Sequence, residues 1–242
     1  MYTIHPLPVG ESVEPEPRIF YLGDCSKTVR LWTYFWLVRG NGRNILVDTG
    51  FNMAKGETFN PEMKQPEDWQ PLSRLSKLGV SPEEIDMVIL THLHWDHFSP
   101  TARQFESAVF WVNKTELEAV LAPPHPWFAQ FVLADTIRQF KDQGRFREVE
   151  GDREIAEGIS VLHTGGHTPG NQSVVVQTSL GKAIITGDVV FTYRNIEEDV
   201  PVGFNSNLME CFAAMQKIRA QADIILPGHD PLVVERYGWE IG

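Results

Sequence analysis

The chain of 242 residues has few cysteines, no block of basic residues and no long apolar run. Its two cysteines, Cys25 and Cys211, are far apart, so they form no disulfide framework and suit a reducing compartment. A net charge of −11 without clustered Lys and Arg argues against a nucleic-acid partner. No apolar stretch approaches the roughly 18 residues that a membrane span needs, and Met1–Pro6 does not resemble a secretory signal. We therefore expect a cytoplasmic protein that binds neither nucleic acid nor a membrane.

The sequence also lacks the Gly-x-Ser-x-Gly motif that presents a nucleophilic serine in many hydrolases. It has instead the run His-Leu-His-Trp-Asp-His at 92–97, directly after the apolar stretch Met87–Leu90. Imidazole and carboxylate are the usual protein ligands of zinc and related divalent metals. A buried strand that ends in such a loop predicts a metal site, and with it an enzyme.

Three later segments place one potential ligand beside glycine after a predicted strand. They are Gly-His at His167, Gly-Asp at Asp188 and Gly-His at His229. Glycine lets the backbone turn sharply and approach an ion closely. Each segment alone is more commonly an ordinary turn or a surface histidine. Together with the first run they give seven potential ligands, which is too many for one zinc ion and suits two: His92, His94, Asp96, His97, His167, Asp188 and His229.

The pattern of the chain predicts alternating strands and helices. The Asn41-Gly42 pair indicates a hairpin between two strands. Helices are expected near 72–78, from Ser81 and over 208–218, and strands at 18–22, 31–38, 44–47, 87–91, 109–112, 159–162, 173–177, 183–186 and 223–226. Strand groups followed by helices in both halves favour two packed sheets with helices outside. We expect a single domain over 1–242, with a helical, aromatic-rich insertion around 113–144.

The motifs resemble those of the metallo-β-lactamase superfamily over positions 48 to 229. The run at 92–97 matches that family's His-x-His-x-Asp-His motif, and the strand-end Asp48 matches an acidic residue that supports the ligand loop. The resemblance implies an α/β fold of four layers, an αβ/βα sandwich, with two divalent metal ions at one edge of the sheets. Zinc is the first candidate, with manganese, iron or cobalt as alternatives. The implied partition gives His92, His94 and His167 to one ion and Asp96, His97 and His229 to the other, with Asp188 as the bridge.

Within the superfamily the chain resembles the N-acyl homoserine lactonases, through Thr-His-Leu-His-Trp-Asp-His and Gly-His-Thr-Pro-Gly. This resemblance implies a hydrolase that opens a lactone or similar carboxylic ester by attack of a metal-bridging hydroxide, with Asp96 or a water molecule carrying a proton to the leaving oxygen. In that group a tyrosine commonly follows the bridging aspartate by three residues. Here that position is Phe191, and Tyr193 is the candidate replacement. Phe98-Ser99-Pro100 and Asn171 also depart from the group's pattern.

The substrate is expected to be a small ester or lactone held against an apolar wall. The aromatic candidates, with Phe98 foremost because it follows His97, are Phe51, Phe98, Trp127, Phe131 and Phe204. Thioester hydrolysis, as in glyoxalase II, is an alternative, although that family carries an added C-terminal helical region. Phosphodiester hydrolysis fits the metals, but the acidic charge opposes a nucleic-acid substrate. A redox enzyme with iron, a non-catalytic metal module and a homodimer also stay open.

Overall fold

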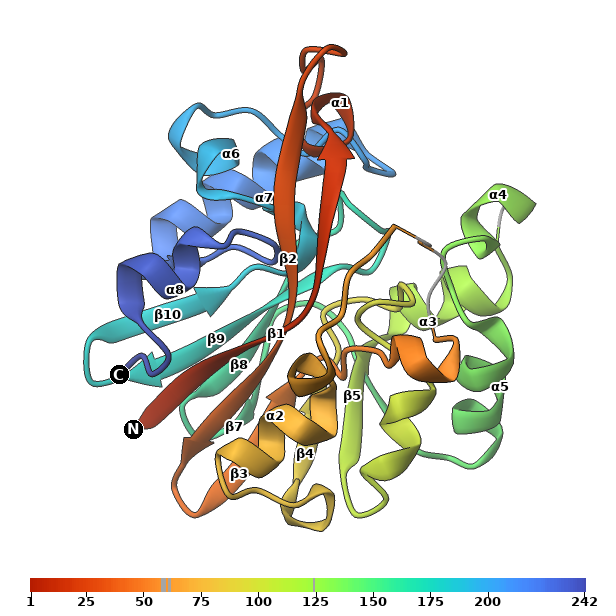
Figure 1. The fold of residues 1–242 in the computed structure, drawn as a ribbon, viewed down its shortest axis with the longest axis vertical. Helices are drawn as coiled ribbons and strands as arrows, with labels where there is room; N and C mark the ends of the chain where they lie inside the picture. The colour runs from red at the N-terminus through yellow and green to blue at the C-terminus, as the bar shows by residue number, and fades with distance from the viewer. Residues whose placement is uncertain (58–59, 61, 124) are drawn as a thin grey trace.

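A long antiparallel hairpin runs through the centre of the molecule (Figure 1). The computed structural model describes residues 1–57, 60, 62–123 and 125–242, and the side chain of Trp127 lies outside this part. Strands β1 (Tyr2–Pro15) and β2 (Thr28–Gly40) pair from Tyr2 opposite Gly40 to Pro15 opposite Thr28. The hairpin carries the short helix α1 (Glu16–Ile19) beyond the sheet. β2 therefore pairs with the first half of the fold and β1 with the second.

The described strands form one hydrogen-bonded sheet that is folded into two halves. In the first half, β3 (Arg43–Val47) pairs with β2 in the antiparallel sense. The strands β4 (Met87–Ile89), β5 (Val109–Asn113) and β6 (Phe146–Val149) follow in that order, each parallel to the one before. The second half joins β1 through Tyr2 opposite Thr178. It contains β7 (Arg153–Ala156), β8 (Ile159–His163), β9 (Gln172–Thr178), β10 (Gly181–Ile185) and β11 (Ile224–Leu226).

Three buried clusters separate four layers, as the alternation of side chains along the strands shows. Val88 points into a cluster with the first set of helices, whereas its neighbour Ile89 points into a cluster between the two sheet halves. In the second half, Val176 faces that same middle cluster and Val175 faces a third one beneath other helices. Successive strand residues point to opposite faces, so each half is covered on both sides. The predicted αβ/βα sandwich is confirmed.

Helices cover the outer face of each half (Figure 1). On the first half lie α2 (Pro71–Lys77), α3 (Lys114–Leu121), α4 (Pro126–Ala129) and α5 (Ala134–Asp142); on the second lie α6 (Tyr193–Glu197), α7 (Leu208–Gln221) and α8 (Leu232–Tyr237). Short 3-10 turns η1 to η5 span Met53–Lys55, Glu67–Trp69, Pro82–Glu84, Pro100–Gln104 and Gly187–Val189. No helix in the described ranges is both long and apolar enough to cross a membrane.

The N-terminal segment departs from the sequence prediction in two places. The strand expected at 18–22 is wrong, because Pro17 lies in the first positions of the helical turn α1, which closes with Phe20 N–H donating to Glu16 O. The strand β1 was not predicted, since Pro6 and Pro8 lie within it. Proline is tolerated there because β1 pairs with β2 along its length and meets β9 on its other side only at Tyr2.

Candidate metal centre

The ends of four strands bring six of the potential ligands and the supporting Asp48 to one edge of the sheets, and His167 joins them from the loop between β8 and β9. Strand β4 leads into the run at 92–97, and its parallel neighbour β3 leads into Asp48. In the other half, β10 and β11 run parallel and lead into Asp188 and His229. Glycine permits the close approach of these two ends, because a Cβ at Gly228 would lie 2.7 Å from the carbonyl oxygen of Gly187. Ligands up to 137 positions apart in the sequence are thereby brought to one site.

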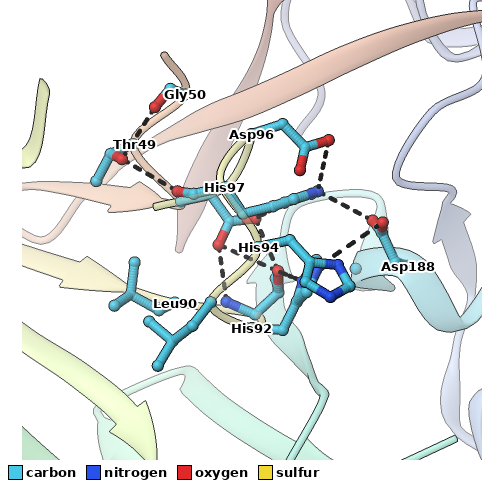
Figure 2. A network of polar contacts seen from close by, with 12 residues as sticks. Thr49, Gly50, Leu90, His92, His94, Asp96, His97 and Asp188 are labelled. Carbon is cyan, nitrogen blue, oxygen red and sulfur yellow. Dashed lines mark hydrogen bonds and ion pairs between the residues drawn. The ribbon is translucent and has the colours of Figure 1, made fainter. Parts of the chain in front are cut away.

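The first group of ligand atoms consists of His92, His94, His167 and Asp188, all within 4.8 Å of one another. The Nδ1 atom of His94 lies 3.1 Å from Nε2 of His92 and 3.1 Å from Nε2 of His167. The Oδ2 atom of Asp188 lies 3.4 Å from Nε2 of His167 and 3.7 Å from Nε2 of His92. Figure 2 shows the Asp188 carboxylate facing this run of imidazoles.

The second group consists of Asp96, His97 and His229, again within 4.8 Å of one another. The other oxygen of Asp188, Oδ1, lies 3.1 Å from Nε2 of His97 and 3.0 Å from Nε2 of His229. Asp96 Oδ2 lies 3.6 Å from Nε2 of His97. Asp188 therefore presents one oxygen to each group, as a carboxylate shared between two ions would.

Hydrogen bonds at the outward nitrogens fix which atom of each imidazole faces the centre. His97 Nδ1 lies 2.8 Å from an Asp48 carboxylate oxygen, and His167 Nδ1 lies 2.8 Å from the carbonyl of Phe204. The outward nitrogen of His229 lies 3.1 Å from a carbonyl of β2. Carbonyl and carboxylate oxygens accept, so each Nδ1 donates and each Nε2 presents its lone pair inward.

This donor set fits a pair of cations. Inward-facing imidazole lone pairs lie close to one another and to the Asp188 oxygens, and such acceptors repel unless a proton or a metal ion lies between them. Among the described side chains, His97 Nε2 is a buried nitrogen without a hydrogen-bond partner. Buried polar atoms are normally satisfied, and a metal ion would satisfy this one.

The electrostatics keep His92, His94 and Asp188 in the forms that bind metals. Burial lowers the pKa of His92 and of His94 well below the ordinary value, so both are neutral near pH 7. Burial acts to raise the pKa of Asp188, but the imidazoles of His229 and His97 outweigh it and hold this pKa well below the usual range. Neutral imidazoles and an ionised carboxylate are the states that metal binding requires. Burial acts to lower the pKa of His97 and of His229, but the Asp188 carboxylate outweighs it and raises both, so a metal ion bound there would displace their protons.

Glu116 supports the centre from outside and was not predicted from the sequence. Its side chain is 1% exposed, and its two oxygens accept hydrogen bonds from Leu93 N–H and Gly170 N–H, each at 3.0 Å. It therefore ties the loop of His92 and His94 to the loop of His167. Its sequence context, the first turn of a helix, does not distinguish it from the exposed Glu118 two residues later.

A cavity of about 420 Å³ opens onto the centre. Asp96, Asp188 and His229 face it, and its aromatic walls include Phe131 and Phe204, which the sequence placed near the substrate, and also Phe191. The Phe131 and Phe204 rings lie 4.8 Å apart in an edge-on arrangement, and each ring also contacts His94.

Two of the predicted wall residues belong to the hydrophobic core instead. Phe98 is fully buried and packs on Phe110 and Phe140 at centroid distances of 6.3 and 5.1 Å. Phe51 is fully buried as well and packs on Trp95 at 4.9 Å. Neither lines the cavity. Adjacency to His97 misled the prediction, because a neighbour in the chain can point to the opposite side of a loop. Trp127, whose side chain lies outside the described residues, stays a prediction.

Tyr193 does not reach the centre. Its side chain is 5% exposed and lies in the middle cluster, with the Arg236 guanidinium 3.8 Å from its ring centroid. It is not among the residues that line the cavity, whereas Phe191 is. The turn at the start of α6, where Thr192 forms a capping box with Asn195, directs Tyr193 into the core.

The segment after the metal run is anchored by a buried carboxylate. Glu57 accepts hydrogen bonds from the hydroxyls of Ser99, at 2.8 Å, and Thr101, at 2.6 Å. It also accepts from the Thr101 N–H at 3.2 Å. The unusual sequence Phe98-Ser99-Pro100 therefore has a structural use, in which phenylalanine fills the core and serine binds the loop that carries Glu57.

Residues 33–229 match the Metallo-beta-lactamase superfamily. The chain belongs to this superfamily. This metallo-β-lactamase homologue is 28% identical over 218 residues to the N-acyl homoserine lactonase of Bacillus thuringiensis, which covers 84% of this chain and 83% of that relative. It is 29% identical over 174 residues to the N-acyl homoserine lactonase AttM of Rhizobium radiobacter, covering 66% and 64% of the two chains.

Solved structures agree with this assignment at the level of the fold. An N-acyl homoserine lactone hydrolase with N-hexanoyl-L-homoserine at its catalytic metal centre superposes with a TM-score of 0.77 at 23% identity, over 97% of this chain and 95% of that one. AidC, a dizinc quorum-quenching lactonase, gives a TM-score of 0.75 at 17% identity over 95% and 88%. The predicted metallo-β-lactamase fold is thus confirmed by comparison as well as by the layers described above.

Proposed function

We propose that this protein is a dinuclear metal hydrolase that opens lactones or similar carboxylic esters. The observation that carries the proposal is the placement of Asp188, whose two oxygens face separate groups of ligands. The lactone as substrate is supported by the N-acyl homoserine lactonases among its relatives.

The ligand assignment follows the two groups. His92, His94 and His167 would hold one ion, Asp96, His97 and His229 the other, and Asp188 both. Zinc is the proposed ion because it favours imidazole with carboxylate in sets of about four, with manganese, iron or cobalt as alternatives. Two such ions supply a water of lowered pKa and a Lewis acid for the substrate carbonyl.

Residues of the protein orient the metal ligands and are placed to move a proton. Asp48 and the backbone carbonyls hold the imidazoles in one tautomer, so their lone pairs stay aimed at the centre. Asp96, whose side chain is 16% exposed and faces the cavity, is placed to carry a proton to the leaving oxygen. Phe191 has no hydroxyl to offer the carbonyl, so help from a tyrosine at that position is excluded.

Turnover of a substrate panel tests this function. The zinc- or manganese-loaded protein is assayed with short and long acyl homoserine lactones, an aromatic lactone, a thioester and a phosphodiester. Lactone hydrolysis that a chelator abolishes and added metal restores is the expected result. Turnover of the phosphodiester alone would overturn the proposal. The native metal, a homodimer and a cytoplasmic location stay predictions, which metal analysis, light scattering and cell fractionation measure.

A further inference from the structure

Phe191 leaves the cavity wall beside His229 without a hydroxyl. The Phe191 ring lines the cavity, and its centroid lies 5.0 Å from the His229 ring and 5.6 Å from the His167 ring. A hydrogen-bond donor at the carbonyl oxygen of an ester stabilises the negative charge that gathers there during hydrolysis. Phe191 offers no such donor, and Tyr193 lies in the core. A donor for this oxygen has to come from another part of the wall.

Thr33 is the polar residue on an otherwise apolar face of β2. Alternate residues of a strand share a face, and on this face Leu31, Thr33, Phe35 and Leu37 are each at most 5% exposed. Leu31 belongs to the buried cluster of the second half of the fold and Phe35 to that of the first half. Thr33 lies between them and lines the cavity that opens onto the metal centre.

The hydroxyl of Thr33 has no hydrogen-bond partner within the described part of the chain. Other buried threonines near the centre are engaged: Thr49 donates to the carbonyl of His97 at 3.0 Å, and Thr91 donates to Asp48 at 2.8 Å. Buried hydroxyls in proteins are normally paired in this way. The Thr33 hydroxyl is therefore available to an oxygen that enters the cavity.

Main-chain hydrogen bonds hold both Phe191 and Thr33 next to His229. The His229 N–H donates to the carbonyl of Phe191 at 2.9 Å. Trp32, the residue before Thr33, donates its N–H to the carbonyl of His229 at 3.0 Å, and its own carbonyl lies 3.1 Å from Nδ1 of that imidazole. The hydroxyl of Thr33 is thus only one residue away from the carbonyl that orients a metal ligand.

We propose that Thr33 is a catalytic residue whose hydroxyl donates a hydrogen bond to the carbonyl oxygen of the substrate, in place of the hydroxyl that Phe191 lacks. This inference rests on the proposed lactonase function. As the oxygen of water bonds to the carbonyl carbon, an electron pair of the C=O bond moves onto the carbonyl oxygen, and a hydrogen bond to that oxygen becomes stronger. The hydroxyl keeps its proton throughout, so it acts as a donor and not as an acid.

Thr33→Val removes the hydroxyl and keeps the shape of the side chain. We expect kcat for N-hexanoyl homoserine lactone to fall about 100-fold, as for the loss of one oxyanion donor, with KM within about threefold. The melting temperature should stay the same or rise, because valine suits a buried strand position and leaves no hydroxyl to desolvate. Metal analysis should still find two ions. A loss of kcat that comes with a loss of metal or of stability would overturn the proposal.

Ser12 supplies the matched control, because it is the other hydroxyl residue of the cavity wall in the described ranges. The backbone of Trp32 points to His229, so β1, with Ser12, lies at the opposite edge of β2. We expect kcat to stay within about twofold of the wild type in Ser12→Ala, and within about fivefold in Thr33→Ser, which keeps the donor. An equal loss in Thr33→Ser and Thr33→Val, or an equal loss in Ser12→Ala, would overturn the proposal.

The wild-type protein separates the two possible failures. If it opens no lactone, the proposed function fails and this inference fails with it. If it opens lactones and Thr33→Val opens them as fast, only this inference fails.

Discussion

The metal centre and the cavity walls are built by different forces. At the centre, an imidazole such as His97 lies between two carboxylates, Asp48 and Asp188, and comes from a loop that follows a buried strand. In the walls, Phe131 comes from the turn between α4 and α5 and Phe204 from the segment between α6 and α7. Their ring contacts include each other and His94. Hydrogen bonds are directional and apolar packing is not. The chemistry is therefore rigidly specified, while the shape of the substrate site depends on packing.

Replacing Asp188 should have the largest effect. In Asp188→Ala both ligand groups lose their common carboxylate, so we expect fewer than two bound metal ions and a loss of turnover well over about 100-fold, more than a supporting residue costs. Metal analysis and steady-state kinetics measure this. The exposed strand-end carboxylate Asp223 supplies the control, Asp223→Ala, which should keep both ions. Unchanged metal content and activity in Asp188→Ala would disprove the bridged centre.

Substitutions of Phe98 and Phe131 distinguish a residue of the hydrophobic core from a residue of the cavity wall. Phe98→Ala should lower the free energy of unfolding by about 3–5 kcal/mol, because it leaves a cavity among Phe110, Phe140 and Phe146. Phe131→Ala, at a half-buried position, should cost less than half of that and change KM instead. Chemical denaturation and kinetics give both quantities. A change in KM without loss of stability in Phe98→Ala would return that residue to the substrate site.

Replacing Glu116 tests whether a residue that binds no metal ion supports the metal centre. Glu116→Ala leaves the N–H groups of Leu93 and Gly170 unpaired, each at a cost of about 1–3 kcal/mol. We expect the unfolding free energy to fall by about 2–4 kcal/mol and metal affinity to fall about 10-fold. Glu118→Ala, exposed on the same helix, should change neither. Equal behaviour of the two variants would exclude a supporting role.

Replacing Tyr193 should have the smallest effect on activity and stability. Its hydroxyl is buried and has no hydrogen-bond partner among the described residues, so Tyr193→Phe removes a polar group that gains nothing from the fold. We expect activity within about twofold of the wild type, and a stability change within about 1 kcal/mol that favours the variant. A tenfold loss of kcat would instead mean that this hydroxyl reaches the substrate.

The layers of the fold and the clustering of the potential ligands could be predicted, because both correspond to local patterns in the sequence. His92, Asp188 and His229 each stand at a strand end next to glycine or another ligand, and the parallel strands bring such ends together. Glu116 has no such mark, since its importance depends on two loops that reach it from elsewhere. The walls could not be predicted for the same reason. Phe98 and Phe131 are both aromatic, and only the tertiary packing decides which of them is buried.

The contact of Glu57 with Ser99 and Thr101 implies that the two sides of the active-site cavity differ in how freely evolution can alter them. Met63 lines the cavity, and Glu57 is bound to Ser99 and Thr101, which follow the metal ligands in the chain. Changes there would be transmitted to His97, and selection for metal binding would remove many of them. On the α3–α4 side, the attachments to the ligand run among the described residues are Glu116 and the carbonyl of Phe131, and the second is a backbone bond that survives a change of side chain. New substrate preferences should therefore arise more readily through substitution of Phe131 than of Glu57 or Glu116.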